Sequence, residues 1–395
     1  MATATSTTQH LLLSPAELAY LHSALLLSPP VRPDGRGASQ FRPLTAEAGV
    51  LPGANGSARI CFADGTEAVV GVKAEVQKSR KAHVSYQDYF YENKELRRKR
   101  HGKGKETEKE DEVSDEEEDK GALIAGENDW VEVTVEIPGY RDDDSSTVFL
   151  ATMLSEALLA DGEFTKKLWI NRRFHWKLYI DIILISPPLS YPLPLLSLTT
   201  HLALLATRLP RLKSEADEDP MFDDDWASST YIYPRQTSTG TPSSRPPVTL
   251  LVMAVGESII FDPSKEELAV ADSALAVSVG GKTVIDGDDG AMDVDGIAET
   301  GRQLRLLSVR TIDPPSRLTA PGVPNSVNLA AWGQGVPAAK DPGARAAEIE
   351  NTEGVWKAPR GGAKVAVLGA MVQKVLEKGG ITDEVLDGLD AVDLG

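Results

Sequence analysis

The sequence has little of several residue types on which common functions depend. Cys61 is the one cysteine among 395 residues, which excludes an intrachain disulfide and a cysteine-based zinc site. The six histidines are scattered, and none forms a closely spaced pair of the kind that ligates a metal. We therefore expect no metal, no cofactor and a reducing compartment such as the cytosol or nucleus.

Long apolar runs and an excess of positive charge are also missing. No apolar run reaches the roughly 18 residues that span a bilayer, and no basic region precedes the short run at residues 11–13. We therefore expect no membrane association. The 59 acidic and 41 basic side chains give a net charge of -18, which argues against nucleic-acid binding by the whole surface. A local basic patch is still compatible with this balance.

The turn after one apolar strand lacks the residues that catalysis uses. Residues 176–185 are predicted to form a buried strand, followed by a helix from Leu195 to Arg208. In α/β enzymes such a turn often holds a carboxylate or cradles phosphate. Residues 186–194 contain prolines and leucines but no acid, glycine or lysine. This pattern favours a turn that serves contact rather than chemistry.

Hydrophobic periodicity predicts two groups of strands and helices, hence a two-part α+β or α/β domain. A capping box at Ser14-Pro15-Ala16-Glu17 predicts a helix over residues 15–27. The first group has predicted strands over residues 58–63, 67–76, 130–137, 168–171 and 177–185, and a helix over 148–159. The second group has predicted strands over residues 248–255, 258–262, 269–279 and 304–310, and a helix over 364–378.

A highly charged insertion interrupts the first group. A basic run that includes Arg97, Arg98 and Arg100 is followed by an acidic run up to Asp119. This composition cannot bury a core and predicts a disordered loop. The basic run is compatible with a solvated loop, a nuclear-import signal or contacts with RNA phosphates. Ser114, which precedes five consecutive acids, is a candidate for phosphorylation by an acid-directed kinase.

The pentapeptide Arg32-Pro33-Asp34-Gly35-Arg36 is the most specific short motif. Proline fixes φ and glycine allows a positive φ, so the segment is predicted to form a tight turn between two arginines. Pairing of Asp34 with an arginine would pin the turn. Alternatively, Arg32, Asp34 and Arg36 are candidates for an anchor at a subunit boundary.

This motif is one of several that together resemble the ribonuclease PH family, and more narrowly the Lys-Ala-Glu branch of exosome ring subunits. Phe261-Asp262-Pro263, with Glu266-Glu267, is similar to the signature of the family's second domain. The resemblance covers about residues 14–327. The other segments that carry it are residues 41–44, 53–58, 64–66, 71–76, 170–181 and 187–194.

The resemblance implies an α+β ribonuclease PH fold of two β-α units, a unit like ribosomal protein S5 domain 2 and a C-terminal ribonuclease PH domain. We divide the chain accordingly. The predicted segments are an N-terminal helix at 1–30, domain 1 at 31–212 with an insertion at about 92–128, a linker at 213–247, domain 2 at 248–380 with an acidic insertion at about 286–301, and a tail at 381–395.

The resemblance also implies membership of a hexameric ring around an RNA channel, capped by S1/KH-type subunits. Active members degrade RNA from its 3′ end by phosphorolysis and carry an Asp-Gly-Gly/Ala turn, whose acid falls near Leu189 here. Arginines that related subunits lend to RNA fall near Ser155 and Leu158. Because none of these positions fits, we expect a non-catalytic ring subunit. Its partners would be other ring subunits, a cap subunit and RNA, in the nucleus, nucleolus and cytoplasm.

Arg141, in the loop where relatives point basic residues into the channel, is the first RNA-contact candidate, followed by Arg97, Arg98 and Arg100. Two other functions are kept as alternatives. One is a phosphorolytic exoribonuclease completed by a partner subunit, in which Asp181 would be required. The other is an acidic adaptor whose charged insertions bind basic proteins.

Overall fold

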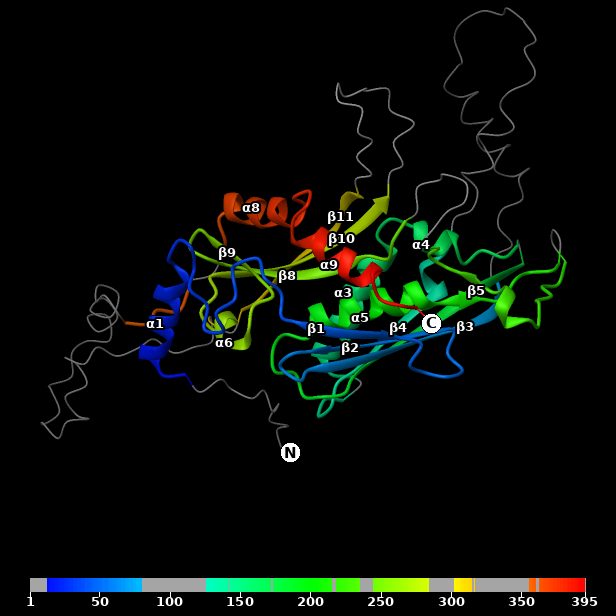
Figure 1. Cartoon of the computed structure of the whole chain (residues 1–395), viewed down its shortest axis with the longest axis horizontal. Helices are drawn as coiled ribbons and strands as arrows, with labels where there is room; N and C mark the ends of the chain where they lie inside the picture. The colour runs from blue at the N-terminus through cyan, green and yellow to red at the C-terminus, as the bar shows by residue number, and fades with distance from the viewer. Residues whose placement is uncertain are drawn as a thin grey trace, which may run out of the picture.

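A computed structural model describes residues 13–79, 126–141, 143–171, 173–214, 218–234, 244–283, 302–314, 316, 355–359 and 362–394. Within these ranges the chain forms two main sheets with helices between and around them, as expected for the α+β class (Figure 1). None of the described helices is long and apolar enough to cross a membrane.

The first sheet has five strands in the order β1-β2-β3-β5-β4. Neighbouring strands are antiparallel, except that β4 runs parallel to β5 and forms one edge. The alternation predicted at residues 131–137 is confirmed, because Val131, Val135 and Ile137 are buried whereas Glu132, Thr134 and Glu136 are exposed. The strands are β1 (Leu44–Ala48), β2 (Gly56–Phe62), β3 (Glu67–Lys78), β4 (Val131–Glu136) and β5 (Phe174–Leu184).

The second sheet is antiparallel, with four strands in the order β11-β10-β8-β9. A small sheet pairs β6 (Arg208–Leu209) with β7 (Thr230–Tyr231). The four strands are β8 (Val248–Val255), β9 (Ser258–Phe261), β10 (Ser273–Thr283) and β11 (Arg302–Ile312).

Helix α5 (Leu193–Ala206) lies between the two sheets, as Figure 1 shows. It contacts β1, β2, β3 and β5 on one side and β8 on the other, and all 14 of its residues are buried. A helix that is apolar on every face is stable in water only when it is covered on every face. The core of the protein is therefore continuous from one sheet to the other.

Helix α3 (Ser145–Leu159) contacts β4 of the first sheet and β8 and β11 of the second, whereas α8 (Val365–Val375) packs on the second sheet over β8 and β10. The capping box predicted at Ser14 is present, and helix α1 (Pro15–Leu25) buries Leu18, Leu21 and Leu25. The other elements are α4 (Glu163–Lys166), α6 (Lys265–Leu268), α9 (Ile381–Asp390), and the 3-10 turns η2 (Asn128–Trp130) and η3 (Trp226–Ser228).

Several local predictions were wrong or incomplete. Residues 168–171 form no strand but a single bridge between Trp169 and His175, because Asn171 turns the chain by accepting hydrogen bonds from the two residues that follow Arg172. β10 begins at Ser273 rather than at residue 269, since α6 precedes it. Part of the segment assigned to a linker forms β7 and η3, and α9 lies in the segment assigned to a tail. The domain boundaries stay a prediction.

Gly56 is the point of closest approach between β2 and the end of α5. A Cβ added there would lie 2.3 Å from Oγ1 and 2.5 Å from Cα of Thr207, which is fully buried. We expect Gly56→Ala to lower the free energy of unfolding by about 1–3 kcal/mol, because the backbone of Thr207 must move. The measurement is urea unfolding followed by circular dichroism.

Gly37→Ala is the matched control for this variant. A Cβ at Gly37 would meet no atom within 4 Å, and Gly37 does not have a positive φ. We expect its unfolding midpoint to stay close to that of the wild type. An equal loss of stability in both variants would contradict the packing argument.

Candidate functional site

Arg32, the first residue of the pentapeptide motif, is buried against the second half of the chain. Its Nε donates to Oε1 of Glu267 at 2.7 Å and its Nη2 donates to Oε2 at 2.8 Å. Both side chains are 0% exposed. Paired hydrogen bonds of this kind fix both position and orientation. The motif is therefore tied to α6, 235 residues further along the chain.

Glu267 has a second role at the start of α6. Its carboxylate accepts a hydrogen bond from the backbone N–H of Ser264 at 2.7 Å, while Ser264 Oγ accepts one from the backbone N–H of Glu267. This capping box begins the short helix and holds the carboxylate where Arg32 contacts it. The helix cap and the ion pair consequently support each other.

Asp262, between β9 and α6, receives two further arginines. Arg36 Nη1 lies 2.9 Å from its Oδ2, and Arg42 Nη2 lies 2.7 Å from its Oδ1. The Asp262 side chain is completely buried, and its φ of 46° lies in the left-handed region that aspartate tolerates better than most residues. Arg32 and Arg36 also donate to the Asp262 carbonyl oxygen, so two guanidinium groups hold the strained backbone at this one atom.

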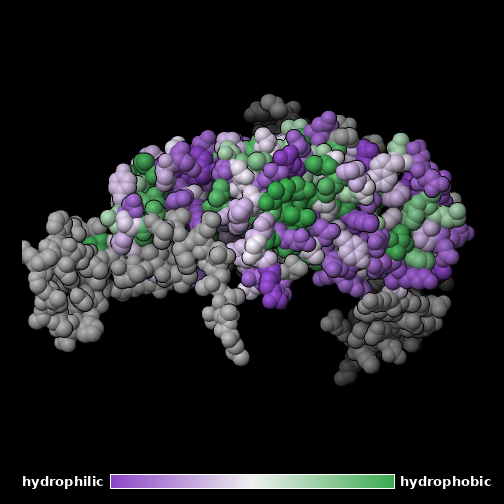
Figure 2. Space-filling view, turned by 90° about the horizontal axis from the view of Figure 1, so that it is seen from below, coloured by the Kyte–Doolittle hydropathy of each residue, from purple (hydrophilic) through white to green (hydrophobic). Residues whose placement is uncertain are grey.

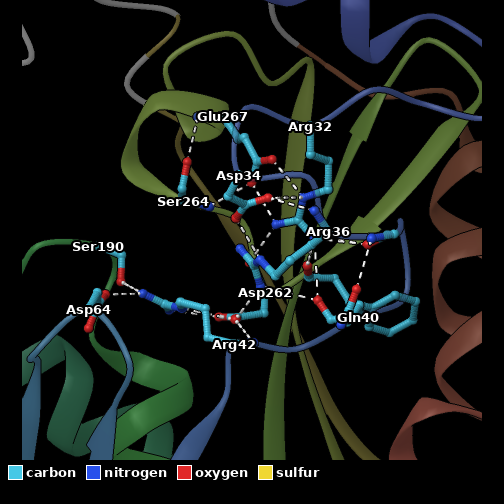
Figure 3. Close-up of polar contacts among 12 residues, drawn as sticks. Arg32, Asp34, Arg36, Gln40, Arg42, Asp64, Ser190, Asp262, Ser264 and Glu267 are labelled. Carbon is cyan, nitrogen blue, oxygen red and sulfur yellow. Dashed lines mark hydrogen bonds and ion pairs between the residues drawn. The ribbon is translucent and has the colours of Figure 1, made fainter.

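Arg42 extends these contacts to the first sheet. Its Nη1 donates to Asp64 Oδ2 at 2.6 Å and to Ser190 Oγ at 2.7 Å, and its guanidinium lies over the ring of Phe62. Asp64 belongs to the turn between β2 and β3, and Ser190 to the turn between β5 and α5. We call this set the arginine–carboxylate cluster (Figure 3), and its members are Arg32, Asp34, Arg36, Arg42, Asp64, Asp262 and Glu267.

Contacts within the cluster favour the ionised forms of Asp64 and Arg42. Burial opposes the charge of Asp64, but hydrogen bonds from Thr66 and the Arg42 guanidinium outweigh it and lower the pKa of Asp64. In the same way burial opposes the charge of Arg42, and Asp262 with Asp64 outweighs burial and raises the pKa of Arg42. Asp64 and Arg42 are therefore held in their charged forms.

The contacts also limit what the cluster can do chemically. Each of its three arginines is engaged by carboxylates, and the side chains of Arg36 and Arg42 are only 8% and 10% exposed. Backbone carbonyls also bind Arg32 and Arg36, and Ser190 binds Arg42. Arginines that hold phosphate need free N–H donors directed at the ligand. The geometry therefore fits a joint between the two halves of the chain rather than a phosphate site.

The structure confirms one interpretation of the pentapeptide and leaves the other as a prediction. Arg36 Nε lies 2.6 Å from Asp34 Oδ2, so pairing with an arginine does pin the turn. Arg32 points into the chain, which assigns it an internal contact. A contact of Asp34 or Arg36 with a neighbouring subunit stays a prediction.

The structure places Arg141 in the loop between β4 and α3. Its side chain is 85% exposed and its Nε lies 3.0 Å from Asp143 Oδ1. Arg141 is accessible to RNA, but Asp143 partly offsets its positive charge. The other candidates, Arg97, Arg98 and Arg100 for RNA and Ser114 for phosphorylation, lie outside the described residues.

The turn between β5 and α5 has no carboxylate at its surface. Leu189, near which the acid of active enzymes falls, is 48% exposed, and Ser190 is bound to Arg42. Asp181 lies inside β5, away from this turn, and accepts a hydrogen bond from Thr134 at 2.6 Å. Ser155 and Leu158 both lie on α3, and Leu158 is buried.

The partners that complete the cluster are not evident from local sequence patterns. Asp262 and Glu267 belong to the segment that is similar to the second-domain signature, and Arg42 belongs to the segment 41–44. The capping-box spacing of Ser264 and Glu267 was the one local signal available. Nothing in the sequence alone pairs them with Arg32.

Comparison with known proteins identifies relatives over most of the chain, although no family model matches. The chain is 29% identical over 272 residues to the exosome complex component RRP42 of Saccharomyces cerevisiae, covering 67% of this chain and 81% of the relative. It is 28% identical over 310 residues to the corresponding component of Schizosaccharomyces pombe, covering 74% and 87%.

The chain is similar in sequence to the RRP42 components of these two yeasts. This similarity agrees with the resemblance to exosome ring subunits seen in the motifs. Among solved structures, an Archaeoglobus fulgidus exosome with RNA bound to the active site matches 75% of this chain and 86% of its own, with 18% identity and a TM-score of 0.43. An archaeal exosome core matches 75% and 84%, with 20% identity and a TM-score of 0.42.

The buried pair of Arg32 and Glu267 can be tested by truncation. We expect Arg32→Ala to lower the free energy of unfolding by about 3–5 kcal/mol, because it leaves the Glu267 carboxylate buried without its partner. The double variant Arg32→Met with Glu267→Gln should recover part of that loss, since it removes both charges. Urea unfolding of the three proteins measures these differences.

Arg59→Ala provides the comparison at an exposed ion pair. Arg59 is 41% exposed and pairs with Glu47 and Glu67 on the outer face of the first sheet. Exposed pairs contribute little to stability because water and salt screen them. A loss at Arg59 as large as that at Arg32 would show that burial does not set the cost.

Proposed function

We propose that this chain is a non-catalytic structural subunit of the RNA exosome core ring. In this role it supports 3′-to-5′ processing and degradation of RNA, including ribosomal RNA maturation and messenger RNA turnover, by completing the ring, seating a cap subunit and guiding RNA. The observation that carries the proposal is homology to RRP42 over two thirds or more of this chain and more than four fifths of each relative.

The absence of catalysis is part of the proposal. Phosphorolysis requires an acid near the reacting bond and arginines that hold phosphate. The turn at residues 185–192 supplies no carboxylate, and Asp181 is engaged by Thr134. The three arginines of the arginine–carboxylate cluster are already bound to carboxylates. Each feature supports a subunit that contributes structure to the ring.

Partners and location follow from the same homology. We propose other ribonuclease-PH-like ring subunits, an S1/KH-type cap subunit and RNA as partners, in the nucleus, nucleolus and cytoplasm. The exposed side chain of Arg141 supports a contact with RNA at the loop between β4 and α3.

The proposal is tested first by native mass spectrometry of the tagged chain purified gently from its own cells. We expect one complex that contains several ribonuclease-PH-like subunits together with cap proteins. When that complex is incubated with RNA and inorganic phosphate, we expect the wild type and Asp181→Asn to release the same amount of nucleoside diphosphate. Phosphate-dependent release that is lost in Asp181→Asn would instead establish the phosphorolytic enzyme, and a lone monomer would overturn the ring assignment.

The contact between Arg141 and RNA is tested in the assembled complex. We expect Arg141→Glu to reduce ultraviolet crosslinking of this subunit to RNA several-fold without changing assembly, because a carboxylate repels phosphate. Lys166→Glu makes the same change of charge at an exposed position of α4 and should leave crosslinking unchanged. Equal crosslinking of Arg141→Glu and the wild type would refute the assignment.

A further inference from the structure

A cleft lies between β4 and α3, at the edge of the first sheet. Its volume is about 790 Å³, and β4, α3, Asn128 and Asp181 line it. The cleft belongs neither to the arginine–carboxylate cluster nor to the turn after β5. Nothing in the proposed function accounts for it.

The β4 edge offers unpaired backbone groups along one side of the cleft. β4 is the last strand in the order β1-β2-β3-β5-β4, and its only partner among the described residues is β5. In a parallel pair, alternate residues direct their N–H and C=O groups away from the partner strand. β4 contains neither proline nor lysine, the residues that commonly protect an edge against further pairing.

The charge of the cleft is acidic. Glu136, Glu156 and Asp181 line it, and no lysine, arginine or histidine among the described residues does. Arg310 neutralises Glu156 through contacts that include one of 3.0 Å from Nε to Oε2. Within the described parts of the chain no cation is paired with Glu136 or Asp181. Two carboxylates of the cleft therefore have no cationic partner among the described residues, and Asp181 keeps its hydrogen bond from Thr134.

The α3 side of the cleft supplies apolar and hydroxyl groups. Val148 lines it and is 51% exposed, and Ala151, Thr152, Ser155 and Leu159 line it as well. Figure 2 shows that hydrophobic residues also gather near the middle of the face seen from below, so apolar surface is not confined to the interior. Apolar surface beside a strand edge suits the side chains of an added strand.

We propose that the β4–α3 cleft binds an extended protein segment with lysine or arginine at alternate positions, which adds to the free edge of β4 as a further strand. Alternate side chains of a strand point to the same face. The basic side chains of the segment would lie beside Glu136 and Asp181, and the intervening apolar side chains would cover Val148. The six residues of β4 accommodate about 20 Å of such a segment.

RNA fits this cleft poorly. Its phosphates would lie beside Glu136 and Asp181 with no paired cation between them, and RNA affinity depends on neutralising phosphates with lysine and arginine. The inference concerns a protein ligand and stands without the proposed ring function, because it rests on the cleft alone.

The test uses the purified full-length chain and fluorescein-labelled eight-residue peptides. One probe alternates lysine and valine, and a second has the same side chains but N-methylated alternate peptide bonds that cannot pair with a strand. A third alternates glutamate and valine. Fluorescence anisotropy should show that the first binds and that the second and third bind at least tenfold more weakly.

Variants separate binding in the cleft from attraction to an acidic protein. We expect Glu136→Lys to weaken the lysine–valine peptide about tenfold, which corresponds to about 1.4 kcal/mol. Glu257→Lys makes the same change of charge in the exposed turn between β8 and β9 and should leave the affinity unchanged. Equal melting temperatures of the two variants confirm that each is folded.

Three outcomes would overturn the proposal. One is equal binding of the unmodified and N-methylated peptides, which would exclude addition of a strand. Another is equal weakening by Glu136→Lys and Glu257→Lys, which would place the peptide elsewhere. The third is binding of a labelled oligouridine to the cleft. If the lysine–valine peptide displaces the oligouridine, and Glu136→Lys strengthens oligouridine binding, the cleft would be assigned to RNA.

Discussion

The buried pair of Arg32 and Glu267 is the interaction on which the arrangement of the two sheets depends. It joins a turn before the first strand to a helix of the second half, and neither charge reaches solvent. A buried ion pair of this kind adds little net stability compared with apolar residues, but removing one member is costly. The pair therefore contributes mainly to the specificity of the fold, because it requires α6 to lie where Glu267 meets Arg32.

The arginine–carboxylate cluster supplies its own arginines with anionic partners. Asp262 accepts hydrogen bonds from both Arg36 and Arg42. The backbone of Asp262, with its positive φ, is stabilised by the same contacts. The same contacts thus supply the arginines with acceptors and stabilise the fold around Asp262.

Local patterns predicted the parts of the fold that local physics determines. The capping box of α1, the alternation in β4 and the apolar runs of β5 and β8 were identified because each signal lies within one element. Helix α9 was missed because its aspartates resemble a solvated tail, whereas Arg302 binds Asp387 and Asp390, and Leu386 and Leu389 are buried. Both halves of the cluster lie in recognisable motifs. Their pairing joins residues 235 positions apart, so no local sequence pattern predicts it.

Helix α5 has a consequence for how the chain can be divided. Its residues are buried on one side by the first sheet and on the other by β8, so each sheet depends on the same helix for its core. A fragment that ends before Val248 would expose the leucines of α5 to water. A fragment that begins at Val248 would lose the helix that covers one face of its sheet. The two halves of the chain consequently share one hydrophobic core, and neither half can bury all its apolar residues alone.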